Sequence, residues 1–296
     1  MIHWNLIQCN LARLNMIGKR FFISGINGML GSSFKNYFLK NNIDFIDKYV
    51  DILNEKGLSE LMKKYKPTHI LHLAALTNVD YCELNPKESY SINYLGTKNI
   101  LNYKTKGSKI IYLSSTGVYG DMSILPHKED EIPYPKTIHH THKLMSEKIL
   151  SENDLIIRTG WLYGGDINQK KNFVAKIIKE SHISNFIYSD KEKYGNPTYV
   201  EDLIFQTIVL IQNEFKGLFN CVNNGSNISR FDYVKKIVEL TTLKPVKEAP
   251  LNYHRRYSPI PNNEMAFNER LDNLGLNKMR EWDKALVEYI NKIKVK

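Results

Sequence analysis

Short apolar runs of strand length recur along the first half of the chain. They are separated by stretches in which apolar residues follow helical spacing. The runs are Phe21–Ser24, Ile43–Ile46, His69–Leu73, Lys109–Ser114 and Leu155–Arg158. An alternation of strand and helix predicts a parallel sheet that is covered by helices on both faces.

Residues that commonly begin helices stand in front of three of the helical stretches. They are Asn54 before Glu55–Tyr65, Asn85-Pro86 before a stretch that reaches about Tyr103, and Ser229 with Asp232 before Val234–Leu240. Proline is tolerated in the first turn because the backbone N–H at that position has no partner within the helix. The sequence therefore predicts three helices that begin at these places.

Composition narrows the class of protein. The 296 residues are 42% hydrophobic and 24% charged, as in an ordinary globular chain. Cys9, Cys82 and Cys221 are too few and too far apart for a disulfide framework or a paired-cysteine metal site. No apolar run approaches the ~20 residues that a membrane-spanning helix needs. We expect a cytoplasmic protein with no membrane partner.

The chain is basic, with 41 Lys and Arg against 31 Asp and Glu and a formal net charge of +10. These basic residues are spread along the whole sequence, which favours a solvated surface over a nucleic-acid partner. We therefore expect no nucleic-acid binding. The same positive field would attract a small molecule that carries a diphosphate.

A glycine-rich loop directly follows the first predicted strand. It reads Gly25-Ile26-Asn27-Gly28-Met29-Leu30-Gly31 and leads into an amphipathic helix that reaches about Lys40. Glycine is needed where a turn is tight and where backbone amides approach a pyrophosphate. This context predicts a dinucleotide site on a doubly wound Rossmann sheet, with cofactor-binding candidates Gly25, Asn27, Gly28, Met29 and Leu30.

The second predicted strand ends in Asp47, about twenty residues beyond the loop, where a carboxylate commonly meets the cofactor ribose. Asp47 could accept hydrogen bonds from the adenosine ribose hydroxyls, which favours NAD. The neighbouring Lys48 could meet a 2′-phosphate, which favours NADP. The sequence leaves the cofactor open between NAD and NADP.

The pattern loosens after Arg158 into turns and shorter elements. We expect residues 18–160 to form the NAD(P)-binding Rossmann domain and residues 161–296 to form mainly a smaller C-terminal substrate-binding lobe, with some segments returning to the first domain. Residues 1–17 lack the basic start and the cleavage site of a secretory signal, so we interpret them as an N-terminal extension.

Several motifs together resemble the extended short-chain dehydrogenase/reductase superfamily and, within it, the dTDP-4-dehydrorhamnose reductases. They occur in the order that the family shows. The motifs are Gly25–Gly31, Asp51-Ile52, Pro67–Asp80, Asn93–Asn99, Ser114–Gly120, Arg158–Gly164, Gly195–Thr198 and Arg280–Leu286. The resemblance runs from about Gly18 to the C-terminus.

The resemblance implies reduction of a 4-keto-6-deoxysugar carried on a nucleoside diphosphate, in polysaccharide biosynthesis. It leaves a homodimer open. By the same resemblance, further positions would contact the cofactor or the nucleotide sugar. Those for the cofactor are Asp51 and Ile52 near the adenine, and Ala74, Ala75 and Thr77 near the nicotinamide and phosphates. Those for the substrate are Val79, Asp80, Trp161 and Asn172.

Reduction of a ketone needs a group that polarises the carbonyl, a proton donor and a cation beside that donor. The family uses Ser or Thr with a Tyr-x-x-x-Lys pair. Here Ser115 holds the hydroxyl position and Lys143 the lysine position, where the lysine would also anchor the cofactor ribose. Four residues before Lys143 stands His139 in place of the tyrosine.

Imidazole has a free pKa of ~6.5 against ~10 for a phenol, so a charged His139 would donate a proton readily. Its ring is shorter than a phenol, and the ammonium of Lys143 disfavours the charged form. Three interpretations stay open: a reductase in which His139 donates directly or through a water, an enzyme of this lineage with weak or altered chemistry, and a non-catalytic cofactor-binding regulator. The regulator would be comparable to the regulatory subunit of methionine adenosyltransferase.

Two further histidines, His140 and His142, stand close to His139. No carboxylate or cysteine completes a set of metal ligands at suitable spacing, so we predict no metal site. We interpret His140 and His142 as helix-start or surface residues.

Overall fold

A six-stranded sheet forms the centre of the computed structural model, which describes residues 16–169, 171–250, 253 and 256–294. The strand order is β2-β1-β3-β4-β5-β9, and every pairing is parallel. The strands are β1 (Phe21–Ser24), β2 (Phe45–Ile46), β3 (His69–His72), β4 (Lys109–Ser115), β5 (Leu155–Thr159) and β9 (Gly217–Asn220). The predicted doubly wound α/β fold is confirmed. Most of the predicted extension, with Cys9, lies outside the described residues.

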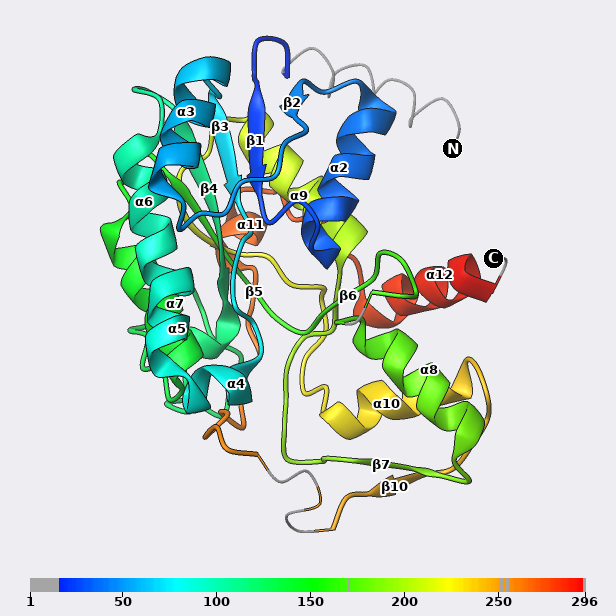
Figure 1. The fold of residues 1–296 in the computed structure, drawn as a ribbon. Coiled ribbons are helices and arrows are strands. Elements are labelled where there is room, and N and C mark those ends of the chain that lie inside the picture. The colour runs from blue at the N-terminus through cyan, green and yellow to red at the C-terminus, as the bar shows by residue number, and fades with distance from the viewer. Residues whose placement is uncertain (1–15, 170, 251–252, 254–255, 295–296) are drawn as a thin grey trace.

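Helices cover both faces of the sheet (Figure 1). On one face lie α3 (Glu55–Tyr65), α5 (Pro86–Tyr90), α6 (Gly96–Tyr103) and α7 (Ile138–Ile149), and on the other α2 (Met29–Asn41) and α9 (Val200–Gln212). Phe21 and Ile23 pack in one buried cluster and Phe22 in the other, because successive strand residues point to opposite faces. Burial on both faces explains why the strands read as continuous apolar runs.

The second strand is shorter than the sequence predicts. β2 covers Phe45–Ile46, whereas the apolar run begins at Ile43. The N–H of Ile43 donates to the carbonyl of Phe38, 3.0 Å away, as α2 ends through Asn42 in the left-handed region with φ 52°. The termination of the helix thus uses the backbone group that the strand would have needed.

The single helix predicted from Asn85 to about Tyr103 is three consecutive segments. They are α5, the π-helical turn η1 (Ser91–Leu95) and α6, preceded by the separate helix α4 (Val79–Leu84). In η1 the carbonyl of Asn93 accepts hydrogen bonds from the hydroxyls of Thr97 and Ser146, at 3.1 and 2.6 Å. These bonds satisfy a carbonyl that the wider turn takes out of the helical ladder.

The C-terminal half of the chain contributes to both parts of the molecule. β9 and α9 belong to the sheet and its covering layer, as described above. The remaining elements are the paired strands β6 (Leu162–Tyr163) with β8 (Thr198–Tyr199) and β7 (Ile187–Ser189) with β10 (Val246–Glu248), and the helices α8 (Phe173–Ile183), α10 (Arg230–Glu239), α11 (Glu269–Asn273) and α12 (Trp282–Lys294). Figure 1 shows α8, α10, β7 and β10 beyond the end of the sheet to which the strands point. The domain boundary at residue 160 stays a prediction.

The three predicted helix starts are confirmed. The side chain of Asn54 accepts a hydrogen bond from the N–H of Gly57 at the start of α3, and Ser229 with Asp232 forms a complete capping box on α10. Asn85 ends α4 and is also the N-cap residue of α5, which begins at Pro86, but its side chain makes no cap hydrogen bond. Its side-chain amide nitrogen donates to the carbonyl of Tyr81.

Candidate active site

The glycine loop joins β1 to α2 at the end of the sheet where the strands finish. Gly25 has φ +71°, and a Cβ built on it would lie 2.8 Å from the backbone nitrogen of Ala74, just beyond β3. A Cβ on Gly31 would lie 2.2 Å from the carbonyl oxygen of Gly25. Only glycine permits this close approach of the loop, α2 and the segment after β3.

The same loop leaves the start of α2 accessible to an anion. Gly28 is the N-cap and has no side chain to cap the helix, and the first turn holds no acidic residue. Asn27 and Gly28 are exposed, Met29 is half-buried and Leu30 is buried. Open N–H groups and the helix dipole suit a diphosphate. The chain order reverses between β1 and β3, which is where ligands bind in open α/β sheets. The residues present therefore fit a dinucleotide.

Asp47, at the end of β2, is already paired with a cation. The ammonium of Lys35 on α2 donates to both carboxylate oxygens, at 2.7 and 2.8 Å. Both side chains are partly exposed. The positive charge of Lys35 thus offsets the negative charge of Asp47. The carboxylate therefore favours NAD over NADP less than it would without this lysine.

Removal of Lys35 is expected to change cofactor preference. In a Lys35→Ala variant the carboxylate of Asp47 loses its counter-charge and repels a 2′-phosphate, while it still accepts hydrogen bonds from ribose hydroxyls. We expect the ratio of the Kd for NADPH to the Kd for NADH to rise by about tenfold, an energy near 1.4 kcal/mol. Titration calorimetry with both nucleotides measures this ratio. The exposed Lys40, also on α2, supplies the control variant Lys40→Ala, and an unchanged ratio in Lys35→Ala would contradict the prediction.

The other predicted cofactor positions line the same end of the sheet. Ala74 and Ala75 are half-buried after β3, and the backbone nitrogen of Ala74 donates to the hydroxyl of Ser24 at 3.2 Å. The hydroxyl of Thr77 accepts a hydrogen bond from Lys171, 2.7 Å away, which the sequence analysis did not predict. This bond links the segment after β3 to the region that precedes α8.

Asp51 and Ile52 form the turn that leads into α3. The carboxylate of Asp51 accepts a hydrogen bond from the N–H of Leu53 at 3.0 Å. Ile52 is buried, and a Cβ built on Gly96 of α6 would lie 2.3 Å from its Cδ1. The side chain of Ile52 thus packs on α6, and a role near the adenine remains a prediction for both residues.

Ser115 and Lys143 come from adjoining elements at this end of the sheet. Ser115 ends β4, and its hydroxyl accepts a hydrogen bond from the N–H of Gly117 at 3.2 Å. Lys143 lies on α7, with its ammonium 4.1 Å from the centre of the Tyr112 ring on β4. Burial lowers the pKa of Lys143 to about 7, and the charge of Glu147 opposes that shift. Burial therefore disfavours the charged form of this lysine relative to that of an exposed one.

His139 occupies a buried position one turn before Lys143. Its Nδ1 lies 3.5 Å from the side-chain nitrogen of Asn93 and 4.0 Å from the sulfur of Cys82. Burial lowers the pKa of His139 well below its usual value, and the charges of His140 and Lys143 lower it further. A hydrogen bond to the backbone of Leu76 acts in the opposite direction. The imidazole is neutral at neutral pH, which is not the charged form that makes proton donation easy.

His140 lies in the first turn of α7, in agreement with its interpretation as a helix-start residue, but the interpretation as surface residues is wrong for His140 and His142, because both are buried. Nδ1 of His140 lies 2.9 Å from the hydroxyl of Thr137, the N-cap of α7, and Nδ1 of His142 lies 2.9 Å from the hydroxyl of Ser89. The His140 ring fills the space above Gly117, where a built Cβ would lie 2.2 Å from its Cε1. A hydroxyl at the start of the same helix, for His140, and a hydroxyl on α5, for His142, give these buried rings polar partners.

The contact between Gly117 and His140 predicts a compensating pair. A Gly117→Ala variant is expected to be destabilised by about 1–3 kcal/mol, because the new methyl group overlaps the ring. A second change, His140→Ala, removes the ring, so the double variant should recover part of the free energy of unfolding that Gly117→Ala loses. Urea denaturation of the two single variants and the double variant measures the coupling. Strictly additive losses would show that the two positions do not constrain each other.

Charged side chains surround Trp161, which lies between β5 and β6. Its indole nitrogen donates to Glu264 at 2.7 Å, and the guanidinium of Arg230 lies 3.4 Å from the centre of its ring. Trp161 has φ 42°, and a Cβ built on Gly195 would lie 2.4 Å from its Cε2. Arg230 and Glu264 were not predicted. The sequence signals near them were the Gly195-Asn196-Pro197 turn and the helix start at Ser229 and Asp232, and neither indicates a partner of Trp161.

Two further predicted substrate residues, besides Trp161, have partners within the protein. The carboxylate of Asp80 accepts from both the N–H and the hydroxyl of Ser258, at 3.0 and 2.6 Å. Asn172 is almost fully buried, caps α8 by accepting from the N–H of Ala175, and donates to the carbonyl of Gly164 at 3.1 Å. Val79, at the start of α4, is half-buried. Direct contact of these positions with a substrate stays a prediction.

A buried ion pair lies behind Lys143. The guanidinium of Arg158 on β5 donates to both carboxylate oxygens of Glu147 on α7, at 3.0 and 2.6 Å. Both side chains are less than 10% exposed, and Arg158 also lies 4.5 Å from the centre of the Tyr119 ring. Glu147 is one helical turn from Lys143, so the pair joins the helix that carries the lysine to the central sheet.

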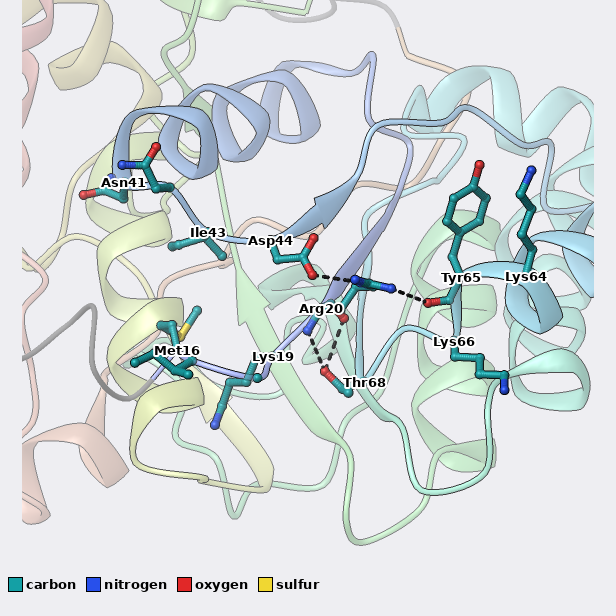
Figure 2. Close-up of a pocket in the computed structure, with 13 residues that line it drawn as sticks. Met16, Lys19, Arg20, Asn41, Ile43, Asp44, Lys64, Tyr65, Lys66 and Thr68 are labelled. Carbon is teal, nitrogen blue, oxygen red and sulfur yellow. Dashed lines mark hydrogen bonds and ion pairs between the residues drawn. The ribbon is translucent and has the colours of Figure 1, made fainter.

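A cavity of about 850 Å³ opens at the opposite end of the sheet (Figure 2). Arg20 lies in it, donating to Asp44 at 2.8 Å and to the carbonyl of Tyr65. Lys19 and Thr68 also line it. Because the strands of a parallel sheet point away from this end, the cavity is separate from the glycine loop, which lies where the strands finish.

No three His, Cys, Asp or Glu side chains in the described part of the chain are grouped so that they could hold a metal ion. Within the same residues, no helix is both long enough and apolar enough to cross a bilayer.

A glycine loop at the switch point of a parallel sheet, with a second lobe beyond the strand ends, is the architecture of the extended short-chain dehydrogenase/reductases, and this chain is of that class. A family model described as the RmlD substrate binding domain matches residues 19–295. The chain belongs to this family.

Three similar proteins illustrate its range. The spore coat polysaccharide biosynthesis protein SpsK of Bacillus subtilis is 24% identical over 92% of this chain and 96% of its own length. The crystal structure of dTDP-4-dehydrorhamnose reductase from Bacillus anthracis, in complex with NADP, matches with a TM-score of 0.86 and 27% identity over 93% of this chain and 99% of that one. The methionine adenosyltransferase 2 subunit beta of Bos taurus is 24% identical over 93% of this chain and 89% of its own length.

Proposed function

We propose that this protein is an NAD(P)H-dependent reductase of a nucleoside-diphosphate 4-keto-6-deoxysugar. The observation that carries the proposal is the placement of Lys143. Its ammonium is buried over the ring of Tyr112 on β4, and β4 is the neighbour of β3, after which Ala74 meets Gly25 of the glycine loop. The similar reductase from Bacillus anthracis, which is in complex with NADP, supports the reaction class. The proposed setting is polysaccharide biosynthesis in the cytoplasm, in keeping with the name of the Bacillus subtilis relative.

The glycine loop, the N-terminus of α2 and the Lys35–Asp47 pair would hold the dinucleotide, as NAD or NADP. Once bound, that cofactor supplies the hydride. In this proposal the hydroxyl of Ser115 polarises the ketone. Lys143 holds the cofactor ribose and supplies the cation beside the proton donor. His139 stands in the place of the proton donor. The neutral state of its ring makes proton supply the weak step of the reduction.

The lobe side would hold the nucleotide sugar. Arg230, stacked on Trp161, is a cation close to the crevice that suits the diphosphate. Trp161 offers an aromatic face to the sugar or the base. Lys171, bonded to Thr77, extends the same positive wall between the two parts of the molecule. A net charge of +10 would help to attract such an anionic ligand.

A second candidate is a regulatory subunit that binds the cofactor without turnover. His139 in place of the tyrosine favours it, because a neutral buried imidazole is a poor acid. The similarity to a methionine adenosyltransferase beta subunit supports it as well. In this alternative the crevice still binds a dinucleotide, and the serine and lysine serve binding alone.

One experiment separates the two candidates. The purified protein is incubated with NADPH or NADH and a dTDP-4-keto-6-deoxysugar, and the loss of nicotinamide absorbance is followed for the parent and for His139→Tyr. We expect slow turnover by the parent and faster turnover by His139→Tyr. Nucleotide binding without turnover in the parent, together with activity in His139→Tyr, would favour the regulatory subunit. A protein that binds neither nucleotide would contradict both candidates.

A further inference from the structure

Asparagine followed by glycine occurs twice in the chain, as Asn27-Gly28 and as Asn224-Gly225. Asparagine is a chemically labile residue, and a glycine after it increases the lability, because glycine has no Cβ to hinder attack of its backbone nitrogen on the asparagine side chain. That attack begins the conversion of the amide into a carboxylate. The two dipeptides have different surroundings in the structure, so their rates of conversion should differ.

Few contacts restrain Asn27 in the glycine loop. The residue is exposed, and its side chain makes no hydrogen bond with the described part of the chain. Gly28 is the N-cap of α2, so Asn27 itself lies outside the helix. The N–H of Gly28 donates to the carbonyl of Gly25 at 2.9 Å, and this turn bond must open before its nitrogen can attack. A single bond in an exposed loop opens at low cost.

Asn224 is held on every side. Its side-chain nitrogen donates to the carbonyl of Met279 at 2.6 Å, and its side-chain oxygen accepts from two other asparagine side chains at 3.2 and 3.3 Å. Its backbone bonds to Arg280 and Trp282 at 2.8 and 2.9 Å. A Cβ built on Gly225 would lie 2.6 Å from Cδ1 of Trp282, so the indole also packs over the glycine. Several bonds must break before this side chain can turn toward the backbone nitrogen of Gly225.

The conversion of Asn27 needs water as its only co-reactant. The backbone nitrogen of Gly28 forms a bond to the side-chain carbonyl carbon of Asn27, and the bond from that carbon to the amide nitrogen breaks. The amide nitrogen leaves as ammonia with the proton of the Gly28 N–H, which leaves a cyclic imide. Water then opens the imide at either carbonyl, which yields aspartate or isoaspartate and releases a proton. No atom is oxidised or reduced.

We propose that Asn27 is a site of spontaneous deamidation, and that the new carboxylate weakens the binding of a dinucleotide at the glycine loop. The second part rests on the proposed function, in which this loop and the start of α2 hold the cofactor diphosphate. A carboxylate directly before the N-cap Gly28 lies at the positive end of the helix dipole and repels a diphosphate. The same dipole favours the carboxylate, so the modified helix is no less stable.

A bound dinucleotide should protect Asn27 from this reaction. Its diphosphate would contact the open N–H groups at the start of α2 and hold the loop in one conformation, so that Asn27 reacts only in the free protein. At a nucleotide concentration of about 100 times the Kd, about 1% of the protein is free, and conversion should slow by up to about a hundredfold. Protein without cofactor would therefore lose affinity with age, and protein that holds cofactor would not.

The first arm of the test follows both dipeptides in the same full-length protein. The protein is aged at mildly alkaline pH with and without NADPH, and mass spectrometry of proteolytic peptides measures the converted fraction of each asparagine. We expect Asn27 to convert at least about tenfold faster than Asn224, and NADPH to slow the conversion of Asn27. Equal rates, or a faster Asn224, would overturn the proposed modification. Unchanged conversion of Asn27 at an NADPH concentration that calorimetry shows to be saturating would overturn its link with the cofactor.

The second arm measures the effect of the charge with two defined variants. Asn27 is not among the residues with a left-handed φ, so alanine and aspartate both fit its backbone. We expect Asn27→Asp to bind NADPH at least about tenfold more weakly than Asn27→Ala in calorimetry, and to unfold at no lower temperature. Equal affinities of the two variants would overturn the effect assigned to the carboxylate. If the parent binds neither NADPH nor NADH, the proposed function fails, while the rates at Asn27 and Asn224 still decide the modification.

Discussion

A Lys143→Met variant is expected to lose turnover by about 10²- to 10⁴-fold and yet to be no less stable than the parent. The ammonium of Lys143 is buried over the Tyr112 ring, and burial lowers its pKa to about 7. Folding therefore takes a charged group out of water with only partial compensation from Glu147. Methionine has a similar length and no charge, so it removes that penalty together with the chemical function.

The pH dependence of stability provides a second readout for Lys143. Between pH 7 and the usual lysine value of 10.5, the folded protein has released the proton while the unfolded chain still holds it. The unfolded state binds more protons, so the free energy of unfolding rises with pH across this window, by at most about 1.4 kcal/mol per unit. Below pH 7 both states are charged and this contribution is flat.

Urea denaturation at several pH values, beside steady-state rates, tests both expectations for Lys143→Met. The variant should lack the part of the rise between pH 7 and 10.5 that the parent shows. Lys148, exposed on the same helix, provides the control variant Lys148→Met, which should keep both the rise and the activity. A large loss of stability in Lys143→Met at neutral pH would contradict the prediction, because it would mean that Lys143 raises the free energy of unfolding.

Loss of the carboxylate of Glu147 is expected to destabilise the protein by about 3–5 kcal/mol. In a Glu147→Gln variant the guanidinium of Arg158 stays buried without its two charge-assisted hydrogen bonds. A penalty of that size is a large part of the roughly 5–15 kcal/mol that a typical domain has. Chemical denaturation followed by circular dichroism measures the change.

An exposed ion pair supplies the matched control for Glu147. Arg20 and Asp44 lie 2.8 Å apart with both side chains about half exposed, and Asp44→Asn should change stability by no more than about 1 kcal/mol. A double variant, Glu147→Met with Arg158→Met, removes both buried charges and should recover most of the loss. If Glu147→Gln proves as mild as Asp44→Asn, the buried pair does not have the energetic role assigned to it.

The order of the fold could be predicted from sequence because the signals that define it are local. A strand buried on both faces is a run of apolar residues, and Phe21–Ser24 meets that condition without reference to the rest of the chain. The beginning of β2 could not be predicted, because Ile43 is apolar enough for a strand but donates its N–H to the carbonyl of Phe38. The break of the helix at η1 depends on Ser146, which is distant in sequence from Asn93.

The candidate site divides in the same way. The glycines and the spacing of Ser115, His139 and Lys143 are visible in the sequence, since each is a position within one short motif. The lysine that pairs with Asp47 was missed because Lys35 lies on α2, and only the fold brings α2 beside the end of β2. The partners of Asp80 and of Trp161, Ser258 and Glu264, come from a segment that no motif connected to them.

The sequence by itself determined the class of fold, the glycine loop and the fact that a histidine stands four residues before Lys143, because composition and spacing along one chain carry that information. Only the tertiary structure decided what that histidine can do. Its protonation depends on Leu76, Cys82 and Asn93, which come from three different segments and meet only after folding. Proton position follows from such contacts in space, and no pattern of neighbours along the chain records them.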